Sequence, residues 1–332
     1  MLNKTINGYT IKRKLGEGGM ADVWYAENKI GKTAAVKILH PDLALNAPIV
    51  ERFINEAKVM VRLDHPNIRQ VYDYDEIDGK PCIIMEYLDG EDFKARMKHG
   101  QKFSEQELEN WWNQLVDALN YTHAQGIVHR DIKPSNIFVD CRDNVKLLDF
   151  GIAKVKDNTS FTQTGQKIGT LMYMSPEQVK DSKHIDYHTD VYSLAVTFIH
   201  LLSGECPYNS DSSDFEICEQ IVYKTIDLRK VPPAWQLFLD PYLKKNPQDR
   251  QDLKPFAQSQ QQSDQRIQSR QTENQQVDKD ETKVEVDIPQ QKRQESKISA
   301  TDTTSPIKFC KRCGTLLTPR ARFCKQCGIK LS

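Results

Sequence analysis

The chain has 332 residues, 38% of them hydrophobic and 28% charged, as in an ordinary soluble protein, and this length allows two or three domains. Lys and Arg total 46 and Asp and Glu also total 46, so the zero net charge gives no reason to expect nucleic acid or an anionic membrane as the main partner. No apolar stretch reaches the ~18 residues that span a bilayer, and residues 1–8 lack the apolar core of a signal peptide, so a cytoplasmic location is expected.

Residues 9–88 carry short runs of alternating apolar and polar residues, broken by turns, which is typical of an antiparallel sheet. The predicted strands are 10–15, 23–27, 33–39 and 81–87, and apolar residues at helical spacing predict one helix over 50–62. From residue 104 onward the pattern is mainly helical, and a capping box of Ser104 and Glu107 marks the first of these helices. The sequence therefore predicts an α+β fold with a small β-rich lobe (about 9–88) and a larger helical lobe (about 89–257).

A glycine-rich segment lies between the first two predicted strands. Glycine lets a backbone approach phosphates closely, and the N–H groups of such a turn can bond to phosphate oxygens, although an ordinary hairpin turn has the same pattern. Lys37 then lies inside an otherwise apolar strand and Glu56 on the following helix, and this order favours a nucleotide site in which Glu56 orients the lysine. The residues of the segment are Leu15, Gly16, Glu17, Gly18, Gly19, Met20, Ala21, Asp22 and Val23.

Residues with the chemistry of phosphoryl transfer lie further along the chain. Asp131, Lys133 and Asn136 are close in sequence, and Asp149 begins an Asp-Phe-Gly sequence thirteen residues after Asn136. The reaction needs positioning, metal ions that neutralise phosphate charge, and an acceptor for the hydroxyl proton. Since Mg²⁺ prefers carboxylate and amide oxygens, Asp149 and Asn136 fit a metal site. Asp131 fits the proton acceptor, and Lys133 fits a cation for the transferring group.

From about residue 9 to residue 256, these motifs and their spacing resemble the signature of the protein kinase family. The resemblance implies a two-lobed fold, ATP and Mg²⁺ as cofactors, and protein substrates phosphorylated on Ser or Thr, because Lys133 follows Asp131 by two positions. It makes Asp131 the catalytic base, and Asn136 and Asp149 the Mg²⁺ ligands. The overall texture is most similar to the bacterial branch of Ser/Thr kinases.

Further residues match the family by position. Lys37, paired with Glu56, would contact the α- and β-phosphates. The segment of Met85, Glu86 and Leu88 resembles the hinge between lobes, with Met85 as gatekeeper and the backbone of the other two facing adenine. Other positions implied by the resemblance are Thr170 against the catalytic loop, Asp190 holding that loop, and Glu177 paired with Arg250.

Three positions depart mildly from the family pattern. Ala21 replaces the third glycine of the turn, and Ser175 and Ala195 replace residues that are usually Ala and Gly. None of these changes removes a charged or metal-binding group, so an active enzyme is favoured over a catalytically silent scaffold that binds partners through the same fold.

Hydroxyl residues lie in the polar segment between Asp149 and Glu177, and Thr162 and Thr164 match the positions usually modified in bacterial relatives. Arg130 directly precedes the expected base, which in this family marks enzymes controlled by phosphorylation of that segment. A phosphate there adds negative charge that can dock on an arginine. Autophosphorylation is therefore expected, and a second copy of the chain is left open as a partner for reaction in trans.

The last part of the chain has a different composition. Residues 258–306 contain twelve glutamines and no aromatic residue, so they are predicted to form a disordered Gln/Ser-rich linker. Residues 307–332 carry two Cys-x-x-Cys-Gly sequences ten residues apart, which predicts a structural Zn²⁺ in a small zinc ribbon, favoured over a redox function. Several Lys and Arg residues make this module basic, and docking to protein is favoured for it over binding to nucleic acid. The expected zinc ligands are Cys310, Cys313, Cys324 and Cys327.

Overall fold

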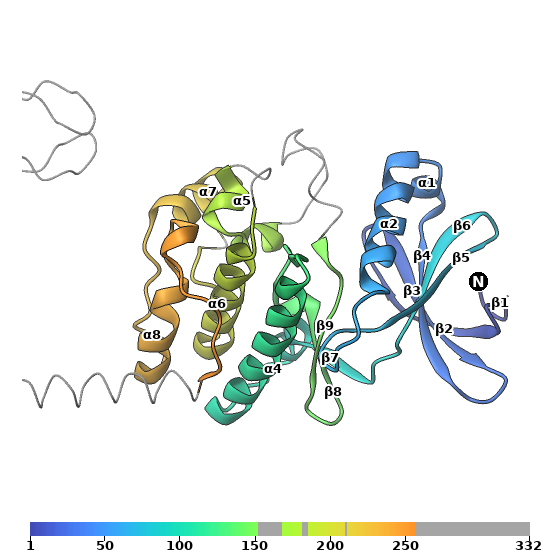
Figure 1. Ribbon diagram of the computed structural model, residues 1–332, viewed down its shortest axis with the longest axis horizontal. Helices are drawn as coiled ribbons and strands as arrows, with labels where there is room; N and C mark the ends of the chain where they lie inside the picture. The colour runs from blue at the N-terminus through green and yellow to red at the C-terminus, as the bar shows by residue number, and fades with distance from the viewer. Residues whose placement is uncertain (152–167, 181–184, 210, 257–332) are drawn as a thin grey trace, which may run out of the picture. The chain divides into compact units, whose positions relative to one another are not determined.

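The computed structural model describes residues 1–151, 168–180, 185–209 and 211–256. Within these ranges a small lobe built on one sheet is followed by a larger and mainly helical lobe, which confirms the predicted order (Figure 1).

The small lobe is a six-stranded antiparallel sheet in the order β1-β2-β3-β4-β6-β5. Helices α1 (Pro41–Ala44) and α2 (Ala47–Met60) follow β4, and α2 packs against β5 and β6. The side chain of Asn46 caps α2 by accepting a hydrogen bond from the N–H of Ile49. The strands are β1 (Thr5–Ile6), β2 (Tyr9–Glu17), β3 (Ala21–Asn28), β4 (Thr33–Leu39), β5 (Val71–Ile77) and β6 (Lys80–Met85).

All four predicted strands form, but β1 and β5 were not predicted. β5 lies at the edge of the sheet, where its buried apolar residues, Val71 and Ile77, are separated by three acidic residues. Its apolar alternation is therefore too weak to stand out in the sequence. The predicted helix over 50–62 is correct in type, but α2 begins at Ala47 and ends at Met60.

The two faces of β4 meet different apolar clusters. Val36 and Ile38 belong to a cluster confined to the small lobe, whereas Ala35 and Leu39 belong to the core that continues into the large lobe. Because successive side chains of a strand point to opposite faces, Lys37 shares the face of Ala35 and Leu39. The strand lysine therefore points toward α2 and the large lobe.

The large lobe is built around α6 (His188–Ser203), which is buried along almost its whole length and ends at Gly204 in the left-handed conformation. The predicted capping box of Ser104 and Glu107 begins α4. A three-stranded sheet in the order β7-β8-β9 lies beside these helices (Figure 1). The other elements are β7 (Gly90–Asp92), α3 (Phe93–Lys98), α4 (Glu105–Ala124), η1 (Pro134–Asn136), β8 (Ile137–Asp140), β9 (Val145–Leu147), η3 (Ile168–Tyr173), α5 (Pro176–Lys180), α7 (Asp214–Tyr223), α8 (Pro233–Leu239), η4 (Asp240–Tyr242) and η5 (Pro247–Asp249).

Residues up to Phe256 complete the core of the large lobe. The indole N–H of Trp112 donates to the carbonyl of Lys254 (2.9 Å), and the N–H of Phe256 donates to the side-chain oxygen of Asn113 (2.7 Å). The Phe256 ring lies 4.3 Å from that of Trp235, centroid to centroid. The predicted linker (258–306) and zinc ribbon (307–332) with its four cysteines lie outside the described residues, and the boundary at 257 stays a prediction.

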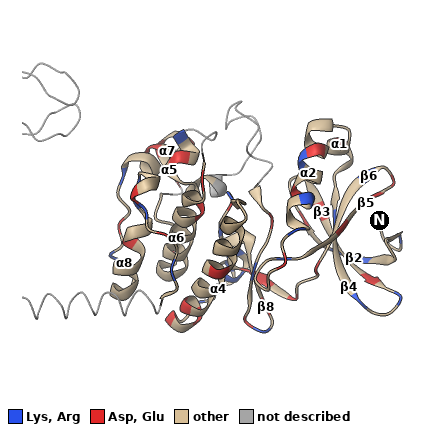
Figure 2. Cartoon of the chain, viewed as in Figure 1, with Lys and Arg blue, Asp and Glu red and all other residues tan. Residues whose placement is uncertain are grey.

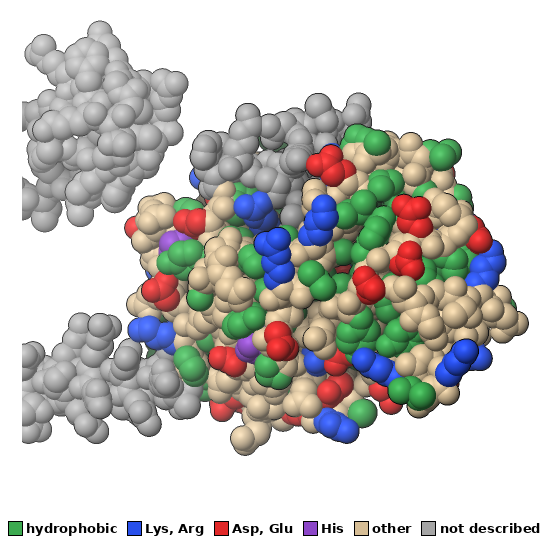
Figure 3. Space-filling model, turned by 45° about the vertical axis from the view of Figure 1, so that its right-hand side comes forward, with side chains coloured by type: hydrophobic (Ala, Val, Ile, Leu, Met, Phe, Trp, Pro, Cys, Tyr) green, Lys and Arg blue, Asp and Glu red, His purple; other side chains and the backbone are tan. Residues whose placement is uncertain are grey.

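Charges of both signs are interspersed over the described surface of both lobes (Figure 2). On the face seen in Figure 3, hydrophobic side chains form small groups between charged ones. None of the described helices combines the length and the apolar composition needed to cross a membrane.

Candidate active site

Lys37 connects the two lobes through two carboxylates. Its Nζ lies 3.2 Å from Oε1 of Glu56 on α2 and 2.8 Å from Oδ2 of Asp149, which follows β9. Burial disfavours the charged lysine, but Asp149 and Glu56 outweigh burial and raise its pKa. Burial also dominates at Glu56 and raises the pKa of that carboxyl despite the nearby lysine. Lys37 is therefore charged, and its two anionic partners come from different lobes.

Arg69, which the sequence interpretation missed, also binds Asp149. Its guanidinium Nη2 donates to Oδ1 of Asp149, and its side chain is only 11% exposed. Loss of water around Asp149 would raise the pKa of its carboxyl, but Lys37 and Arg69 together hold that pKa well below its usual range. No motif singles out this arginine, because its partner lies 80 residues away in the sequence.

Asp131, Lys133 and Asn136 lie on the segment between α4 and β8. Oδ2 of Asp131 accepts hydrogen bonds from Nζ of Lys133 (2.8 Å) and from Nδ2 of Asn136 (2.9 Å). Nδ2 of Asn136 also donates to the backbone carbonyl of Asp131, so its amide oxygen is left for another ligand. The backbone carbonyl of Asn136 accepts from the N–H of Leu148 (2.9 Å), which places Asn136 beside the residue preceding Asp149.

The buried carboxylate of Asp190, in the first turn of α6, binds the backbone just before Asp131, in the segment 129–136 that is called the catalytic segment below. It accepts the backbone N–H of His129 and that of Arg130, each at 2.8 Å, and a ring nitrogen of His123 at 2.8 Å. Arg130 has a φ of 66°, in the left-handed region that is uncommon for a residue with a side chain. Its bond to Asp190 therefore helps to stabilise a backbone conformation that a residue with a side chain rarely adopts.

The Asp-Phe-Gly sequence packs tightly against the same segment. The ring of Phe150 lies 4.4 Å from that of His129, and burial lowers the pKa of this histidine, so its ring is neutral. The N–H of Gly151 donates to the carbonyl of His129 (2.8 Å). A Cβ atom on Gly151 would lie only 2.9 Å from that of Asp131, so glycine allows this close approach.

The glycine-rich segment forms the end of β2, an exposed turn and the start of β3. The N–H of Gly18 donates to the carbonyl of Ala21 across the turn (3.0 Å). Nζ of Lys14 reaches Glu17 (2.9 Å) and Asp22 (3.0 Å), which braces the two strands at the turn. Ala21 is buried, so its methyl group adds to the core instead of crowding the turn.

The predicted hinge has one backbone donor already in use. The N–H of Glu86 donates to the carbonyl of Gln70 (2.8 Å), and both carboxylate oxygens of Glu86 lie 2.9 Å from Nζ of Lys146. Met85 is 1% exposed and ends β6. Within the part of the chain that the structure describes, the carbonyl of Glu86 and the N–H of Leu88 make no backbone hydrogen bond, so both are available to a ligand.

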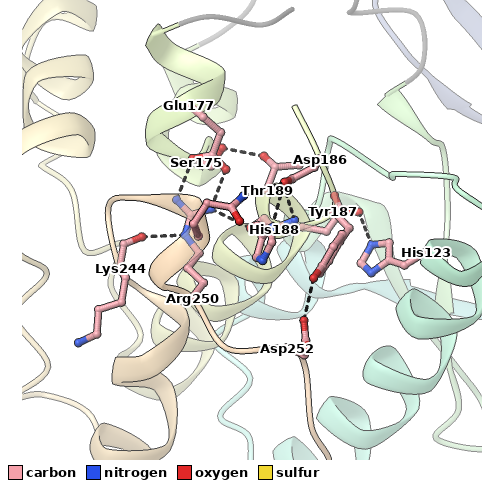
Figure 4. A network of polar contacts seen from close by, with 12 residues as sticks. His123, Ser175, Glu177, Asp186, Tyr187, His188, Thr189, Lys244, Arg250 and Asp252 are labelled. Atoms are coloured by element: carbon pink, nitrogen blue, oxygen red, sulfur yellow. Dashed lines mark hydrogen bonds and ion pairs between the residues drawn. The ribbon is translucent and has the colours of Figure 1, made fainter. Parts of the chain in front are cut away.

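A second ionic cluster lies deeper in the large lobe (Figure 4). The guanidinium of Arg250, which is 5% exposed, binds both carboxylate oxygens of Glu177 at 2.6 and 2.8 Å. It also donates to the backbone carbonyls of His188 (2.8 Å), Lys244 (2.7 Å) and Lys245 (3.2 Å). The predicted pair of Glu177 and Arg250 therefore forms, and it joins α5 to the start of α6 and the end of the lobe.

Ser175, one of the departures from the family pattern, has a local partner for its hydroxyl. Its Oγ lies 2.7 Å from Oγ1 of Thr189 and accepts the N–H of Gln178 (3.3 Å). The side-chain Nε2 of Gln178 donates to the carbonyl of Arg130 (2.9 Å). The serine thus belongs to a set of bonds that ties α5 to α6 and to the catalytic segment.

Most residues predicted for the nucleotide and metal sites are therefore brought close together or lie on the hinge and glycine turn. Thr162 and Thr164, and the side chain of Thr170, lie outside the described residues. Within the described ranges, no three or more His, Cys, Asp or Glu side chains come together as a group that could hold a metal ion.

Comparison with known proteins identifies the fold. A sequence model of the protein kinase domain matches residues 9–263. The chain belongs to the protein kinase family. It is 38% identical over 215 residues to the serine/threonine-protein kinase PrkC of Bacillus subtilis (strain 168), covering 64% of this chain and 33% of that protein. It is 35% identical over 257 residues to the serine/threonine-protein kinase PknB of Mycobacterium leprae (strain TN), covering 73% and 40%.

A solved structure agrees with this assignment. A point mutant of the kinase domain of Mycobacterium tuberculosis PknI is similar with a TM-score of 0.60 and 28% identity, and the match covers 79% of this chain and 98% of that one. The chain spans about a third of the length of the PrkC relative and 40% of PknB. Membership of the kinase family implies ATP and Mg²⁺ as cofactors.

Proposed function

We propose that the chain is a protein Ser/Thr kinase that transfers the γ-phosphoryl group of ATP to protein hydroxyls. One observation carries the proposal: Lys37, Glu56 and Asp149 form a connected ionic cluster beside the hydrogen-bonded set of Asp131, Lys133 and Asn136. The similarity to bacterial Ser/Thr kinases supports the same activity.

Each group has a role in the reaction. Asp131 accepts the proton of the substrate hydroxyl. At the same time the hydroxyl oxygen forms a bond to the γ-phosphorus, and the bond from that phosphorus to the leaving ADP oxygen breaks. Lys133, 2.8 Å from Asp131, supplies positive charge where the transferring group gains negative charge. Lys37 neutralises the α- and β-phosphates, while Glu56 holds its ammonium in place.

The residues present fit a Mg²⁺ site. Asp149 supplies a carboxylate, and Asn136 supplies an amide oxygen whose orientation is fixed because its nitrogen is bound to Asp131. When bound, Mg²⁺ neutralises phosphate charge and orients the γ-phosphoryl group. The carbonyl of Glu86 and the N–H of Leu88 are the groups expected to bind adenine, beside the gatekeeper Met85.

The first experiment is an autophosphorylation assay with radiolabelled ATP and Mg²⁺, with Asp131→Asn as the inactive control. Transfer by the wild type and its loss in the variant support the kinase. If the wild type folds and binds ATP but neither protein transfers phosphate, the chain is a catalytically silent scaffold that binds partners through the kinase fold.

We further infer control by autophosphorylation at Thr162 or Thr164. The support is Arg130: its Nε is buried and has no hydrogen-bond partner among the described residues, so a phosphate has an available cation. Mass spectrometry after incubation with Mg·ATP should find phosphate on one of these threonines. A fully active enzyme with an unmodified segment would contradict this control.

The third part of the proposal concerns residues 307–332. Four cysteines in two Cys-x-x-Cys-Gly sequences support a structural zinc ribbon for docking to partners. Purified protein should hold about one zinc per chain, lost in the double variant Cys310→Ser, Cys313→Ser. Residues 1–260 alone should keep kinase activity, and chelation should leave the melting temperature of the kinase domain unchanged. A lower kinase melting temperature after chelation would mean that the two parts do not fold independently.

A further inference from the structure

Both carboxylate oxygens of Asp149 are bound by cations of the protein itself. Nζ of Lys37 lies 2.8 Å from Oδ2, and Nη2 of Arg69 donates to Oδ1. The first contact belongs to the nucleotide-binding set described above. The second does not, and it occupies a ligand oxygen of the proposed metal site.

Arg69 is held in this position by its backbone. Its N–H donates to the carbonyl of Leu147 (2.9 Å), two residues before Asp149. The next residue, Gln70, donates its N–H to a carboxylate oxygen of Glu86 (3.3 Å) and accepts the N–H of Glu86 (2.8 Å). Backbone hydrogen bonds therefore fix the main chain of Arg69 between the end of β9 and the hinge. This anchoring holds the guanidinium close to Asp149.

The charges of this cluster balance without an added ion. Glu56 and Asp149 provide two negative charges, and Lys37 and Arg69 provide two positive charges. The guanidinium is nearly buried, and its Nε has no hydrogen-bond partner among the described residues. The side chain of Asp149 is 40% exposed, so part of it is accessible to an ion from solvent. A divalent cation arriving at Asp149 meets a carboxylate that is already neutralised.

We propose that Arg69 is a positioning residue that competes with the divalent cation for Asp149 and so raises the metal concentration that the enzyme needs. This inference rests on the proposed kinase function, because it takes Asp149 as a metal ligand. The physical reason is that a fixed positive charge on the ligand carboxylate reduces the attraction of that carboxylate for a second cation. Kinase activity should therefore depend on Mg²⁺ over a higher range than it would without Arg69.

The test measures metal binding without turnover, using Mn²⁺ and the non-hydrolysable ATP analogue AMP-PNP. Calorimetric titration with AMP-PNP at a series of Mn²⁺ concentrations measures how the affinity for the nucleotide rises with metal. The quantity compared is the free Mn²⁺ concentration that gives half of this rise. We expect Arg69→Met to lower this concentration about tenfold, because the substitution removes a positive charge that repels the metal ion at its ligand carboxylate. Arg69→Lys keeps the charge and should stay closer to the wild type. Arg229→Met, which removes an exposed arginine paired with Asp227, is the matched control and should change nothing.

Equal or higher half-saturating Mn²⁺ in Arg69→Met would overturn the proposal. So would weaker binding of metal-free AMP-PNP with unchanged Mn²⁺ dependence, because Arg69 would then be a phosphate contact. If Arg69→Met does not fold, NMR spectra of the wild type labelled with ¹⁵N-arginine test the proposal instead. Its Arg69 guanidinium signals, assigned with Arg69→Lys, should shift when Mg²⁺ is added to the AMP-PNP complex, and unchanged signals would refute competition. Absence of phosphoryl transfer by the wild type is a separate result that refutes the kinase function itself.

Discussion

Two ionic clusters, one buried and one partly open to solvent, differ in how their bonds are shared. In the cluster of Glu177 and Arg250, one guanidinium binds both oxygens of one carboxylate and three backbone carbonyls (Figure 4). In the cluster of Lys37, Asp149 and Arg69, one lysine is divided between two carboxylates and one carboxylate between two cations. In the first cluster the protein itself supplies acceptors for the whole guanidinium. In the second, Lys37 can exchange a carboxylate for a phosphate, and Asp149 can exchange a protein cation for a metal ion.

The difference shows which buried charges stabilise a fold and which serve a ligand. A charge whose every hydrogen bond is made by the protein has nothing left for a substrate, so Arg250 fixes the large lobe. Asp190 is of the same kind, since its carboxylate is filled by two backbone N–H groups and His123. The raised pKa of Glu56 and the lowered pKa of Asp149 mark the other kind, in which two unlike carboxylates share one lysine.

The largest expected effect is on catalysis, in Lys37→Met. Phosphoryl transfer should fall by at least about a hundredfold, because the variant loses a preorganised cation for the phosphates. The melting temperature should change little, since Glu56 can take up a proton and Asp149 keeps Arg69. Initial rates with Mg·ATP and thermal denaturation followed by circular dichroism measure the two effects. A large loss of stability with retained activity would remove the distinction between the clusters.

Arg250→Met should act in the opposite way and lower stability by about 3–5 kcal/mol, because it leaves the largely buried Glu177 carboxylate without its partner. Denaturant titration measures the loss, and the double variant Arg250→Met, Glu177→Met should recover part of it. The control is Lys230→Met. In the wild type Lys230 lies 2.5 Å from Glu205, but the Glu205 side chain is 66% exposed, so this variant should melt like the wild type. Equal stability of Arg250→Met and Lys230→Met would contradict a structural role for Arg250.

The sequence predicted this contrast only in part. The short motifs around Asp131 and Asp149 could be recognised because residue type and order along the chain are enough to place them, and the resemblance to the kinase family implied the pair of Glu177 and Arg250. Arg69 could not be recognised, because its role depends on the path of the chain after α2. In the structure its neighbour Ile68 forms an isolated parallel bridge with Leu147, and the N–H of Arg69 donates to the carbonyl of Leu147. β5 was missed for a related reason: its acidic residues hide a strand whose position is set by pairing with β6.

Gly151→Ala would sharpen the comparison on the catalytic side. The added methyl group would meet the Cβ of Asp131 at 2.9 Å and the carbonyl of His129 at 3.3 Å, so the Asp131 segment must shift. A displacement of the base by a fraction of an ångström to about 1 Å should lower kcat by up to about a hundredfold. Stopped assays at saturating Mg·ATP measure this effect, and Gly100→Ala, at a positive φ with open space around its Cβ, controls for the loss of a glycine elsewhere. A normal kcat would show that this close approach is not needed for catalysis.

The smallest expected effect is that of Ser175→Ala, the matching small change beside the structural cluster. The substitution leaves the fully buried hydroxyl of Thr189 without its 2.7 Å partner and removes the acceptor of the Gln178 N–H. An unpaired buried hydroxyl costs about 1–3 kcal/mol, so a loss of about 1–2 kcal/mol is expected, with kcat unchanged because no group at the reacting atoms is altered. The double variant Ser175→Ala, Thr189→Val removes both hydroxyls and should cost less than the sum of the single variants, since neither hydroxyl is then left without its partner and the Gln178 N–H loses its acceptor only once. Additive losses of stability in this cycle would mean that the two hydroxyls do not stabilise the fold through their hydrogen bond. A lower kcat in Ser175→Ala would instead show that Ser175 contributes to the catalytic site.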